Sequence, residues 1–500
     1  MSLPWFNIIV CVDARFGISK NGETPWDKPD DLINFRAITT ARSPNDKPNL
    51  CIMGRKTFEQ VKYLHKREIL VISTSMKDHK KAVSVEPDFA SALKWASRNK
   101  DEIGQIFVCG GSRIYNEAIR HPAATMLYIN KLDRDYECDN LIPDIQVIFD
   151  STRESGWEFQ DEIFGHRHYF RRNLHENAYL DLLKDVIGSE LRPNRTGIPS
   201  YSKFAQRLEY PLIDGFGRKV LPLLTTKRVP YKLVLSELLW IMNGGTDTKF
   251  LLEHNNHIWD GNSTREFLNK RGLGHYEVGE LGPLYGFQWR FFGSSYMTNT
   301  EYKETGIDSE DARIALYQQE GYDQITAVIE SIRTDPFSRR HVVSAWNPPQ
   351  LKDMALAPCH FVFMFYVSCE RGDGKTDNFS NTTPKYLSCH LVMRSNDMFL
   401  GHPFNVASYA TLTHMIAAMT GLTAKELVIT MNDCHVYSNH VDQVKEQTMR
   451  SPCGFPTMEF SDDIKKKIEE NTLQLEDFNM SSIIVNDYTC WKTIKADMAV

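Results

Sequence analysis

The feature that most constrains the fold is an alternation of short apolar runs and helical patterns between residues 6 and 172. Two of the helical patterns are DFASALKWASRN (88–99) and SRIYNEAIR (112–120). Strands that alternate with helices favour an α/β fold with a mostly parallel central sheet. The stretch WEFQDEIFGHRHYFRR (157–172) predicts a closing hairpin at one edge of this sheet. The expected strands are 7–12, 49–53, 68–73, 105–110 and 126–132.

A chain of 500 residues is too long for one hydrophobic core. Its length favours about three domains, and two large ones are also plausible. Residues 173–190 have apolar residues at helical spacing with Gly188 near the end, which leaves almost no linker. We therefore place one domain at 1–172 and the other at 173–500, in a fairly fixed relation. Helices are expected at 231–243, 321–334 and 404–420, and strands at 341–346, 360–369, 386–394 and 426–431.

Composition excludes several classes of protein. The longest apolar run, 361–367, is far short of the roughly 20 residues that span a bilayer, and the N-terminus meets charge too early for a secretory signal. We therefore expect a cytoplasmic protein. The 10 cysteines are scattered with no CxxC, which argues against disulfides and metal sites. A net charge of −6 gives no global basic field for nucleic acid.

Two polar stretches, 293–320 and 370–385, interrupt the second domain. We expect both to be surface excursions.

Two glycine turns in the first domain are suited to phosphate. In MGRKTF (53–58), Gly54 lets a strand turn into a helix that begins with Arg55, Lys56 and Thr57. In VCGGSRIY (108–115), two glycines again end a strand and start a helix. Free N–H groups at a helix N-terminus bind anions. The alternative is that both stretches are ordinary strand–helix turns that bind no phosphate.

An acid lies near two aromatic residues in GISKNGETPWDKPDDLINF (17–35). Trp26 precedes Asp31 by five residues, and Phe35 follows it by four, so Asp31 and Phe35 share a helix face. An acid partly buried beside a ring could assist a protonation. The alternative is an acid that interacts with the helix dipole.

Together, VCVDARFGI, PDDLINF, IMGRKT, VCGGSRIY and LYINKL resemble dihydrofolate reductase over residues 6–172. The resemblance implies reduction of the folate pteridine ring with NADPH, and Asp31 as the acid in the pterin pocket. Folate contacts would come from Ile9, Val10, Phe35 and Arg67. Cofactor contacts would come from Gly54, Arg55, Lys56, Thr57, Ser73, Thr74, Ser75, Gly110, Gly111 and Tyr115.

Three features depart from that family. Thr24 stands where a leucine precedes Pro-Trp, and Asn130 stands where a threonine usually hydrogen-bonds the acid. The loop between Phe58 and Arg67 lacks the usual proline-rich form. Since an asparagine can also donate and accept, we expect activity to be retained.

Cys359, in LAPCHF, opens an apolar strand. It is either a small buried hydrophobe or a nucleophile, and a nucleophile needs cations that lower its thiol pKa from about 8.5 toward neutrality. Arginines lie in RTG (195–197), DPFSRR (335–340) and MRSND (393–397). These are more cations than Cys359 needs, so they could also bind a phosphate dianion.

Other polar residues stand in apolar contexts. Glu237, in VLSELLWIM, must be paired or functional. Asn405 begins an apolar helix, where the alternative is an N-cap-like role. His435 and Tyr437 are two residues apart, so on a strand end both could face one ligand.

Residues 173–500 resemble thymidylate synthase through RTG, TTKR, ELLW, LGPLYGFQWR, DPFSRR, MALAPCHF, GHPFNVASYA and DCHVYSNH. The resemblance implies an α+β fold and addition of Cys359 to C6 of deoxyuridine monophosphate (dUMP), with 5,10-methylenetetrahydrofolate as co-substrate. Catalytic roles would fall to Cys359, Glu237 and Tyr285. The nucleotide contacts would be Arg195, Arg394, Ser395, Asn405, His435 and Tyr437, with Arg339 and Arg340 from the partner of a homodimer. Trp259 and Asp397 would contact folate, His360 would support the site, and Val500 would belong to a closing segment.

Met393 replaces the family's glutamine before Arg394, and His402 stands at a usually apolar position. We expect Met393 to remove hydrogen bonds behind the nucleotide pocket.

The two halves in this order resemble the bifunctional dihydrofolate reductase–thymidylate synthase family, in which one domain consumes the dihydrofolate that the other makes. No metal, membrane or required nucleic acid is implied. A basic path through Lys227 and Arg228 could steer folate between sites. One rival is a hydroxymethylase acting on a cytosine nucleotide, which Asn405 disfavours. Another is a non-catalytic or nucleic-acid-binding protein that retains the folds.

Overall fold

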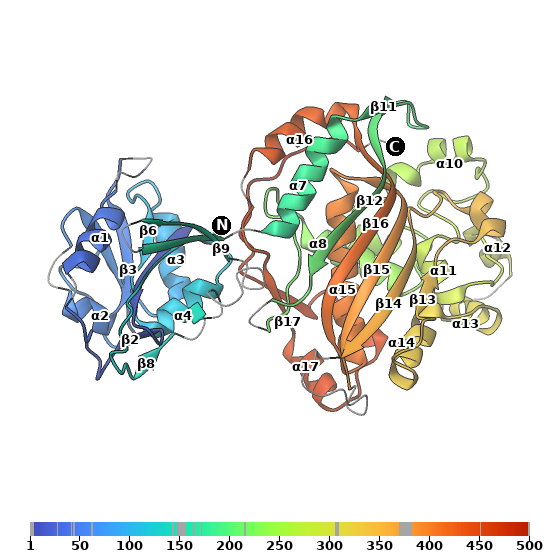
Figure 1. Cartoon of the computed structure of the whole chain (residues 1–500). Coiled ribbons are helices and arrows are strands. Elements are labelled where there is room, and N and C mark those ends of the chain that lie inside the picture. The colour runs from blue at the N-terminus through green and yellow to red at the C-terminus, as the bar shows by residue number, and fades with distance from the viewer. Residues whose placement is uncertain are drawn as a thin grey trace.

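The computed structural model describes residues 5–27, 29–41, 43, 46–61, 64–142, 145–146, 148, 157–163, 166–171, 173–214, 217–305, 310–369, 383–450 and 452–498. Val500 and residues 370–382 of one expected excursion lie outside these ranges. Figure 1 shows two domains side by side, the first in blue and the second running from green to red.

The first domain is an α/β unit whose sheet has the strand order β5-β4-β3-β6-β1-β7-β10-β9. Neighbours from β5 to β7 pair in parallel, whereas β10 pairs antiparallel with β7 and with β9. The predicted parallel sheet and edge hairpin are therefore confirmed. The strands are β1 (Phe6–Val12), β3 (Asn49–Gly54), β4 (Arg67–Ile72), β5 (Ser84–Glu86), β6 (Ile106–Val108), β7 (Ala124–Lys131), β9 (Trp157–Ile163) and β10 (His166–Arg171).

Most of the helices of this domain follow strands of its parallel sheet. A small ribbon of β2 (Gly17–Ser19) and β8 (Asn140–Leu141), which the sequence did not indicate, joins two distant loops. The helices of this domain whose bounds fall within the described residues are α1 (Pro29–Thr39), α2 (Arg55–Gln60), α3 (Phe89–Arg98) and α4 (Ser112–Arg120).

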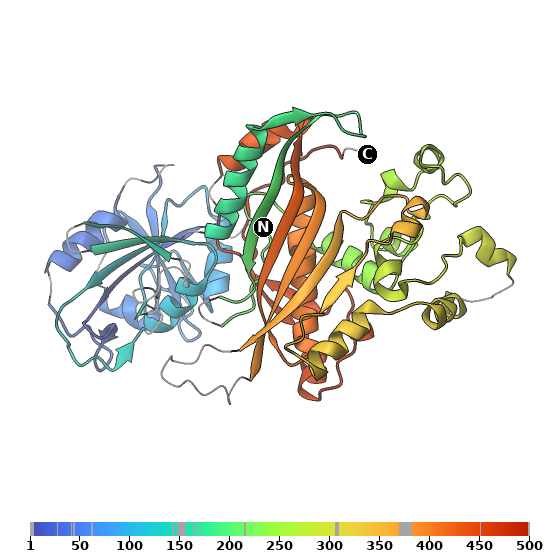
Figure 2. The same ribbon diagram turned by 45° about the vertical axis from the view of Figure 1, so that its right-hand side comes forward.

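The join between the domains is helical, as predicted. Helix α7 (Leu174–Ile187) follows β10 directly; the Asn173 side chain accepts from the Glu176 N–H, and Gly188 is the C-cap. Figures 1 and 2 show α7 next to the first domain.

The second domain is α+β, with a sheet in the order β11-β12-β16-β15-β14-β13. Alternate residues of its long strands, such as Phe363 and Phe365, are buried against α15, whereas Tyr366 is exposed. The strands are β11 (Glu190–Arg192), β12 (Ser200–Pro211), β13 (Val342–Ser344), β14 (His360–Cys369), β15 (Pro384–Asp397) and β16 (Thr423–Tyr437), with β17 (Thr457–Phe460) and β18 (Ile483–Asn486) as a separate ribbon.

The helices expected at 231–243, 321–334 and 404–420 are present as α8, α14 and α15, within a few residues of the predicted ends. The helices of this domain are α7, α8 (Tyr231–Met242), α9 (Lys249–Glu253), α10 (Arg265–Arg271), α11 (Tyr285–Phe291), α12 (Asn299–Glu304), α13 (Glu310–Glu320), α14 (Gln324–Thr334), α15 (Gly401–Met419), α16 (Val441–Thr448) and α17 (Asp462–Glu469). Short 3₁₀ turns cover Asp260–Asn262, Pro348–Asp353, Ser438–His440 and Leu475–Asp477.

The excursion expected at 293–320 lies at the edge of the second domain, but it is helical and partly packed on that domain. This stretch holds α12 and α13, and Tyr317 is buried against Phe287 and Phe291 of α11. The polar sequence of this stretch did not indicate helix α13, because the buried face of that helix is narrow.

Within the described ranges, no helix is long and apolar enough to cross a lipid bilayer. Across the same residues, no group of three or more His, Cys, Asp or Glu side chains is arranged to hold a metal ion.

Candidate active sites

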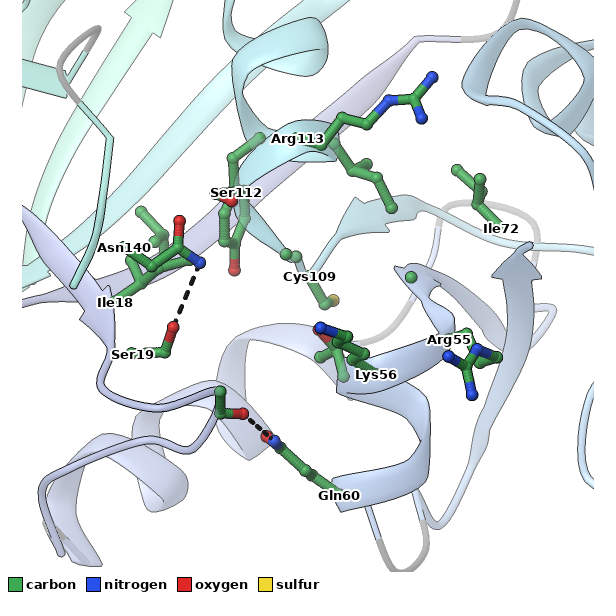
Figure 3. Close-up of a pocket in the computed structure, with 18 of the residues that line it drawn as sticks. Ile18, Ser19, Arg55, Lys56, Gln60, Ile72, Cys109, Ser112, Arg113 and Asn140 are labelled. Atoms are coloured by element: carbon green, nitrogen blue, oxygen red, sulfur yellow. Dashed lines mark hydrogen bonds between the residues drawn. The ribbon is translucent and has the colours of Figure 1, made fainter. Parts of the chain in front are cut away.

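A cavity of about 800 Å³ opens in the first domain where parallel strands end and helices begin. Figure 3 shows Arg55 and Lys56 of α2 on one side, with Ser112 and Arg113 of α4 on the other. Most of the predicted reductase residues line it: Val10, Asp31, Gly54, Arg55, Lys56, Thr57, Ser73, Thr74, Ser75, Gly110, Gly111 and Tyr115.

The glycine turns let side chains of the cavity wall pack closely against the backbone. Gly110 has a φ of 112°, and a Cβ there would lie 3.1 Å from the Tyr115 ring. A Cβ on Gly54 would lie 3.2 Å from Ile114. The bare backbone, the basic side chains of α2 and the serines after β4 fit the phosphates of a dinucleotide.

Asp31 lies at the wall of this cavity, in the first turns of α1. The Asn130 side-chain amide donates to its carboxylate over 2.9 Å, so Asn130 provides the hydrogen bond expected of it. Thr24 and Trp26 also line the cavity.

Three predicted folate residues do not line this cavity. Ile9 is buried in a cluster on which Phe35 packs, and the Arg67 guanidinium lies 5.6 Å from the centre of the Phe35 ring. Arg67 donates to the Thr39 hydroxyl over 2.7 Å, and burial lowers its pKa. These residues group around the Phe35 side of α1.

Several cavity residues were missed by the sequence analysis. Gln60 donates to the Gly22 carbonyl over 2.6 Å, and Asn140 donates to the Ser19 hydroxyl over 3.2 Å (Figure 3). No local pattern could show these contacts, because the partners lie far apart in the sequence and meet only in the tertiary structure. The missed residues are Cys11, Ile18, Ser19, Gly22, Asp27, Leu32, Gln60, Ile72, Pro87, Asp88, Phe89, Cys109, Ser112, Arg113, Ile114, Glu117 and Asn140.

The second site is built around Cys359, just before β14. Arg394 of β15 donates to the carbonyls of Ala357 and Pro358 over 2.7 and 2.9 Å, and its Nη2 lies 3.7 Å from Cys359 Sγ. The arginine therefore holds the loop and faces the sulfur.

Burial and neighbouring cations act in opposite directions on the pKa of Cys359. Burial raises the pKa of the Cys359 thiol, and Arg394 and Arg195 offset this effect only in part. The sequence revealed the cations but not the depth at which the sulfur lies.

Glu237 on α8 is paired, as required of an acid in an apolar helix. Trp259 Nε1 donates to its carboxylate over 2.9 Å, and burial raises the pKa of Glu237 to about 7. The group can therefore both hold and release a proton near neutral pH.

Tyr285 links the cysteine to the rings behind it. Its hydroxyl accepts from the Cys359 N–H over 2.8 Å, and its ring stacks on His360 with centroids 3.8 Å apart. The His360 Nδ1 lies 2.8 Å from the Tyr409 hydroxyl, and burial lowers the pKa of His360 to about 3. Near neutral pH, His360 is therefore a neutral support.

The end of β16 carries His435 and Tyr437, as predicted, with ring centroids 5.2 Å apart. His435 Nδ1 lies 3.1 Å from Asp433, whose pKa it lowers. Asp397, at the end of β15, accepts from the N–H groups of Phe399 and Leu400.

The pKa of Tyr437 shows that several of these residues lie close enough to interact, and therefore belong to one site. Tyr437 has a pKa that burial raises, that Asp397 and Cys359 raise further, and that Arg195 lowers. Arg195 is exposed in the loop between β11 and β12, and Ser395 lies between Arg394 and Asp397 on β15.

Asn405 lies in the second turn of α15, because that helix begins at Gly401 with Leu400 in the N-cap position. The alternative N-cap role is therefore wrong. The Asn405 amide donates weakly to Met393 Sδ over 3.6 Å. Met393 therefore still accepts one weak hydrogen bond, in place of the stronger ones that a glutamine would make.

Arg339 and Arg340 are exposed between α14 and β13, as the sequence indicated. Lys227 is not a surface residue: it is 6% exposed, donates to the Phe399 carbonyl, and burial lowers its pKa to about 7. The hypothesis of a basic path through Lys227 is therefore wrong, although Arg228 is exposed.

The fold and the two sites define a two-domain enzyme, with a nucleotide-binding α/β domain followed by an α+β domain that presents a cysteine. Family models agree: dihydrofolate reductase matches residues 5–172, and thymidylate synthase matches residues 177–500. The chain belongs to the bifunctional dihydrofolate reductase–thymidylate synthase family.

Relatives with that name span the whole chain. The protein of Leishmania major is 36% identical over 537 residues, covering 100% of this chain and 96% of the relative. That of Zea mays is 34% identical, with 99% and 97% covered. That of Paramecium tetraurelia is 34% identical, with 99% of each covered.

Proposed function

We propose that this chain methylates dUMP to dTMP with 5,10-methylenetetrahydrofolate and reduces the resulting dihydrofolate to tetrahydrofolate. The observation that carries the proposal is the presence of both sites on one chain of this family. The division at residues 172 and 173 is supported by the short interval between β10 and α7.

In the reductase domain, Asp31 assists protonation of the pteridine, held in place by Asn130. The bound NADPH supplies a hydride. Its phosphates would be held by Arg55, Lys56, Thr57 and Ser73 to Ser75, and Gly110, Gly111 and Tyr115 would approach its nicotinamide side; all of these residues line the cavity. Val10, which lines the cavity, would wall the folate. Ile9, Phe35 and Arg67, which group beside the cavity, would extend this wall, and Arg67 would take the folate carboxylate.

In the synthase domain, the Cys359 thiolate adds to C6 of the uracil ring, and C5 then attacks the one-carbon unit of the folate. Loss of the C5 proton and departure of the folate leave an exocyclic methylene group. The folate reduces this group with a hydride, becoming dihydrofolate, and Cys359 is expelled as dTMP forms. Arg394 faces the sulfur, and Tyr285, whose hydroxyl accepts from the Cys359 N–H, would act near the C5 proton. Glu237, with its pKa of about 7, organises proton transfer to the base.

The remaining residues bind the two substrates. Asn405 reads the uracil edge, and His435 and Tyr437 hold the ribose hydroxyl. Trp259 and Asp397 contact the folate ring. Arg195, Arg394 and Ser395 bind the phosphate.

The synthase site is completed in a homodimer, in which Arg339 and Arg340 reach the phosphate of the other subunit. Two observations support this assembly. Both arginines are exposed. The sheet of the synthase domain also exposes large apolar side chains, with Phe204 78% exposed and Tyr366 69% exposed. The added positive charge would also lower the Cys359 pKa. The cytoplasm is the proposed location, which suits ten free cysteines.

Two substitutions in the full-length chain test the proposal. Cys359→Ala should abolish dTMP formation and leave NADPH-dependent reduction of added dihydrofolate intact. Asp31→Asn should lower the reductase rate by about 100-fold or more and leave dTMP formation intact. Spectrophotometric assays of both reactions on each sample provide the measurement. A wild-type chain that binds dUMP and NADPH but turns over neither would contradict the proposal.

A further inference from the structure

The synthase domain holds the C-terminal end of helix α4, whose N-terminal end forms part of the reductase cavity. From this geometry we infer that Arg218 of the synthase domain is a positioning residue for the reductase nucleotide site. The inference rests on the proposed reductase function. Figure 1 shows α4 on the side of the first domain next to the second.

The contacts at the C-terminal end of α4 cross between the domains. Arg218 Nη2 donates to the carbonyl of Arg120, the last residue of α4, over 2.8 Å. The N–H of Gly454 donates to the Pro122 carbonyl over 3.2 Å. A guanidinium at this position satisfies a terminal carbonyl and complements the negative end of the helix dipole.

Arg218 is itself held in a fixed orientation. Its Nε donates to the Asp214 carboxylate over 2.8 Å, and its own N–H donates to the same side chain over 2.9 Å. The side chain is 28% exposed, so the ion pair is sheltered from solvent. A guanidinium bridging a carboxylate and a carbonyl has little freedom to move away.

A second contact lies beside the first. The buried ring of His121, the C-cap of α4, accepts from the Ala123 N–H at Nδ1, which leaves Nε2 to donate to Asp487, 3.5 Å away. Asp487 follows β18 in the synthase domain, and His121 lowers its pKa.

The N-terminal end of α4 lies in the reductase cavity. Ser112, Arg113 and Tyr115 line it, and Gly111 is the N-cap. The Gly110 carbonyl accepts from the Gly54 N–H over 2.8 Å, which ties this end to the α2 turn. Both proposed phosphate turns therefore depend on the position of one helix.

Helix α4 is short enough to act as a rigid element. Its nine residues span roughly 13 Å, and SRIYNEAIR contains neither glycine nor proline. Tyr115 donates to the Ile9 carbonyl over 2.8 Å, so a shift along the helix axis would move a contact inside the cavity wall. Loss of the Arg218 contact should therefore change the positions of Gly111 and Arg113.

The test uses the full-length chain with Arg218→Ala and Arg218→Lys. Arg218→Ala should raise the NADPH dissociation constant, measured by NADPH fluorescence, and the reductase KM for NADPH by about 3- to 10-fold. Its synthase kcat and KM for dUMP should stay within about twofold. Arg218→Lys should recover part of the NADPH affinity, because an ammonium can still donate to the Arg120 carbonyl.

Arg271→Ala is the matched control, since exposed Arg271 also donates to a carbonyl, that of Leu351, entirely within the synthase domain. It should leave NADPH binding unchanged. If Arg218→Ala does not fold, Asp487→Asn replaces it and should weaken NADPH binding in the same direction. Unchanged NADPH affinity, or a parallel loss of both activities with a lowered melting temperature, would overturn the inference. A wild type without reductase activity would instead contradict the proposed function.

Discussion

At the scale of the residue, Glu237 lies where burial makes its charge unfavourable but makes its proton exchange useful. It lies on an apolar helix with a Trp259 hydrogen bond, and burial raises its pKa to about 7. The same desolvation that makes its charge costly brings its protonation equilibrium to working pH.

Glu237→Gln should therefore lower synthase kcat by about 100-fold or more, because Gln cannot exchange a proton. The Trp259 hydrogen bond survives, since a glutamine oxygen can accept it. Steady-state assays of dTMP formation check the loss, and reductase kcat serves as the internal control. A rate within threefold of wild type would exclude a proton-transfer role.

The same substitution should raise stability at alkaline pH. A carboxyl whose folded pKa lies above its unfolded value of 4.5 destabilises the fold progressively as pH rises from 4.5 to about 7. Above pH 7 the variant should gain about 2–3 kcal/mol, and this gain should vanish near pH 4.5. Melting curves at pH 8 and pH 5 measure it. An equal difference at both would contradict the assigned pKa.

At the scale of the element, the junction of β15 and α15 is held by His402 in the first helical turn. Asn396 of β15 donates to its Nδ1 over 2.8 Å, so Nε2 donates to the Tyr210 hydroxyl of β12, also over 2.8 Å. Its ring stacks on Tyr179 of α7, and burial lowers its pKa to about 3. One neutral imidazole thus connects two strands and two helices.

His402→Leu, which restores an apolar residue, should destabilise the protein by about 2–4 kcal/mol, because it removes the partner of two buried polar groups. Urea unfolding followed by tryptophan fluorescence measures the change. Adding Tyr210→Phe to His402→Leu should recover part of the loss, since the orphaned hydroxyl is then gone. A stable single variant would show that the hydrogen bonds are dispensable.

At the scale of the whole molecule, the proposed dimer shares its synthase sites between subunits. Cys359→Ala and Arg340→Ala chains should each be nearly inactive as synthases. Refolded together in equal amounts, half of the dimers would be mixed, each with one intact site, so about a quarter of wild-type activity should return.

Activity of the remixed sample and its sedimentation behaviour are the measurements. Co-refolded Cys359→Ala and Glu237→Gln chains are the matched control. Both residues lie in the same subunit's site, so no activity should return. Equal recovery in the two mixtures would contradict a shared site.

Sequence reasoning was most accurate where the signal is local. The strands β1, β3, β4 and β7 and the helices α8 and α15 were found because apolar period and glycine turns are written in neighbouring residues. It failed for α13, whose buried face is narrow, and for the β2–β8 ribbon, whose two strands are more than a hundred residues apart. It also placed Lys227 on the surface, where a charge normally lies.

The sequence by itself determined the two domains and their order and supplied the candidate residues proposed for both sites, because these depend on local pattern and on motifs with fixed spacing. Only the tertiary structure decided how deeply those groups lie. Burial raised the pKa of Cys359 and Glu237 and lowered that of Lys227, and it fixed His402 as neutral. Desolvation depends on every atom packed around a group, and those atoms come from segments hundreds of residues apart.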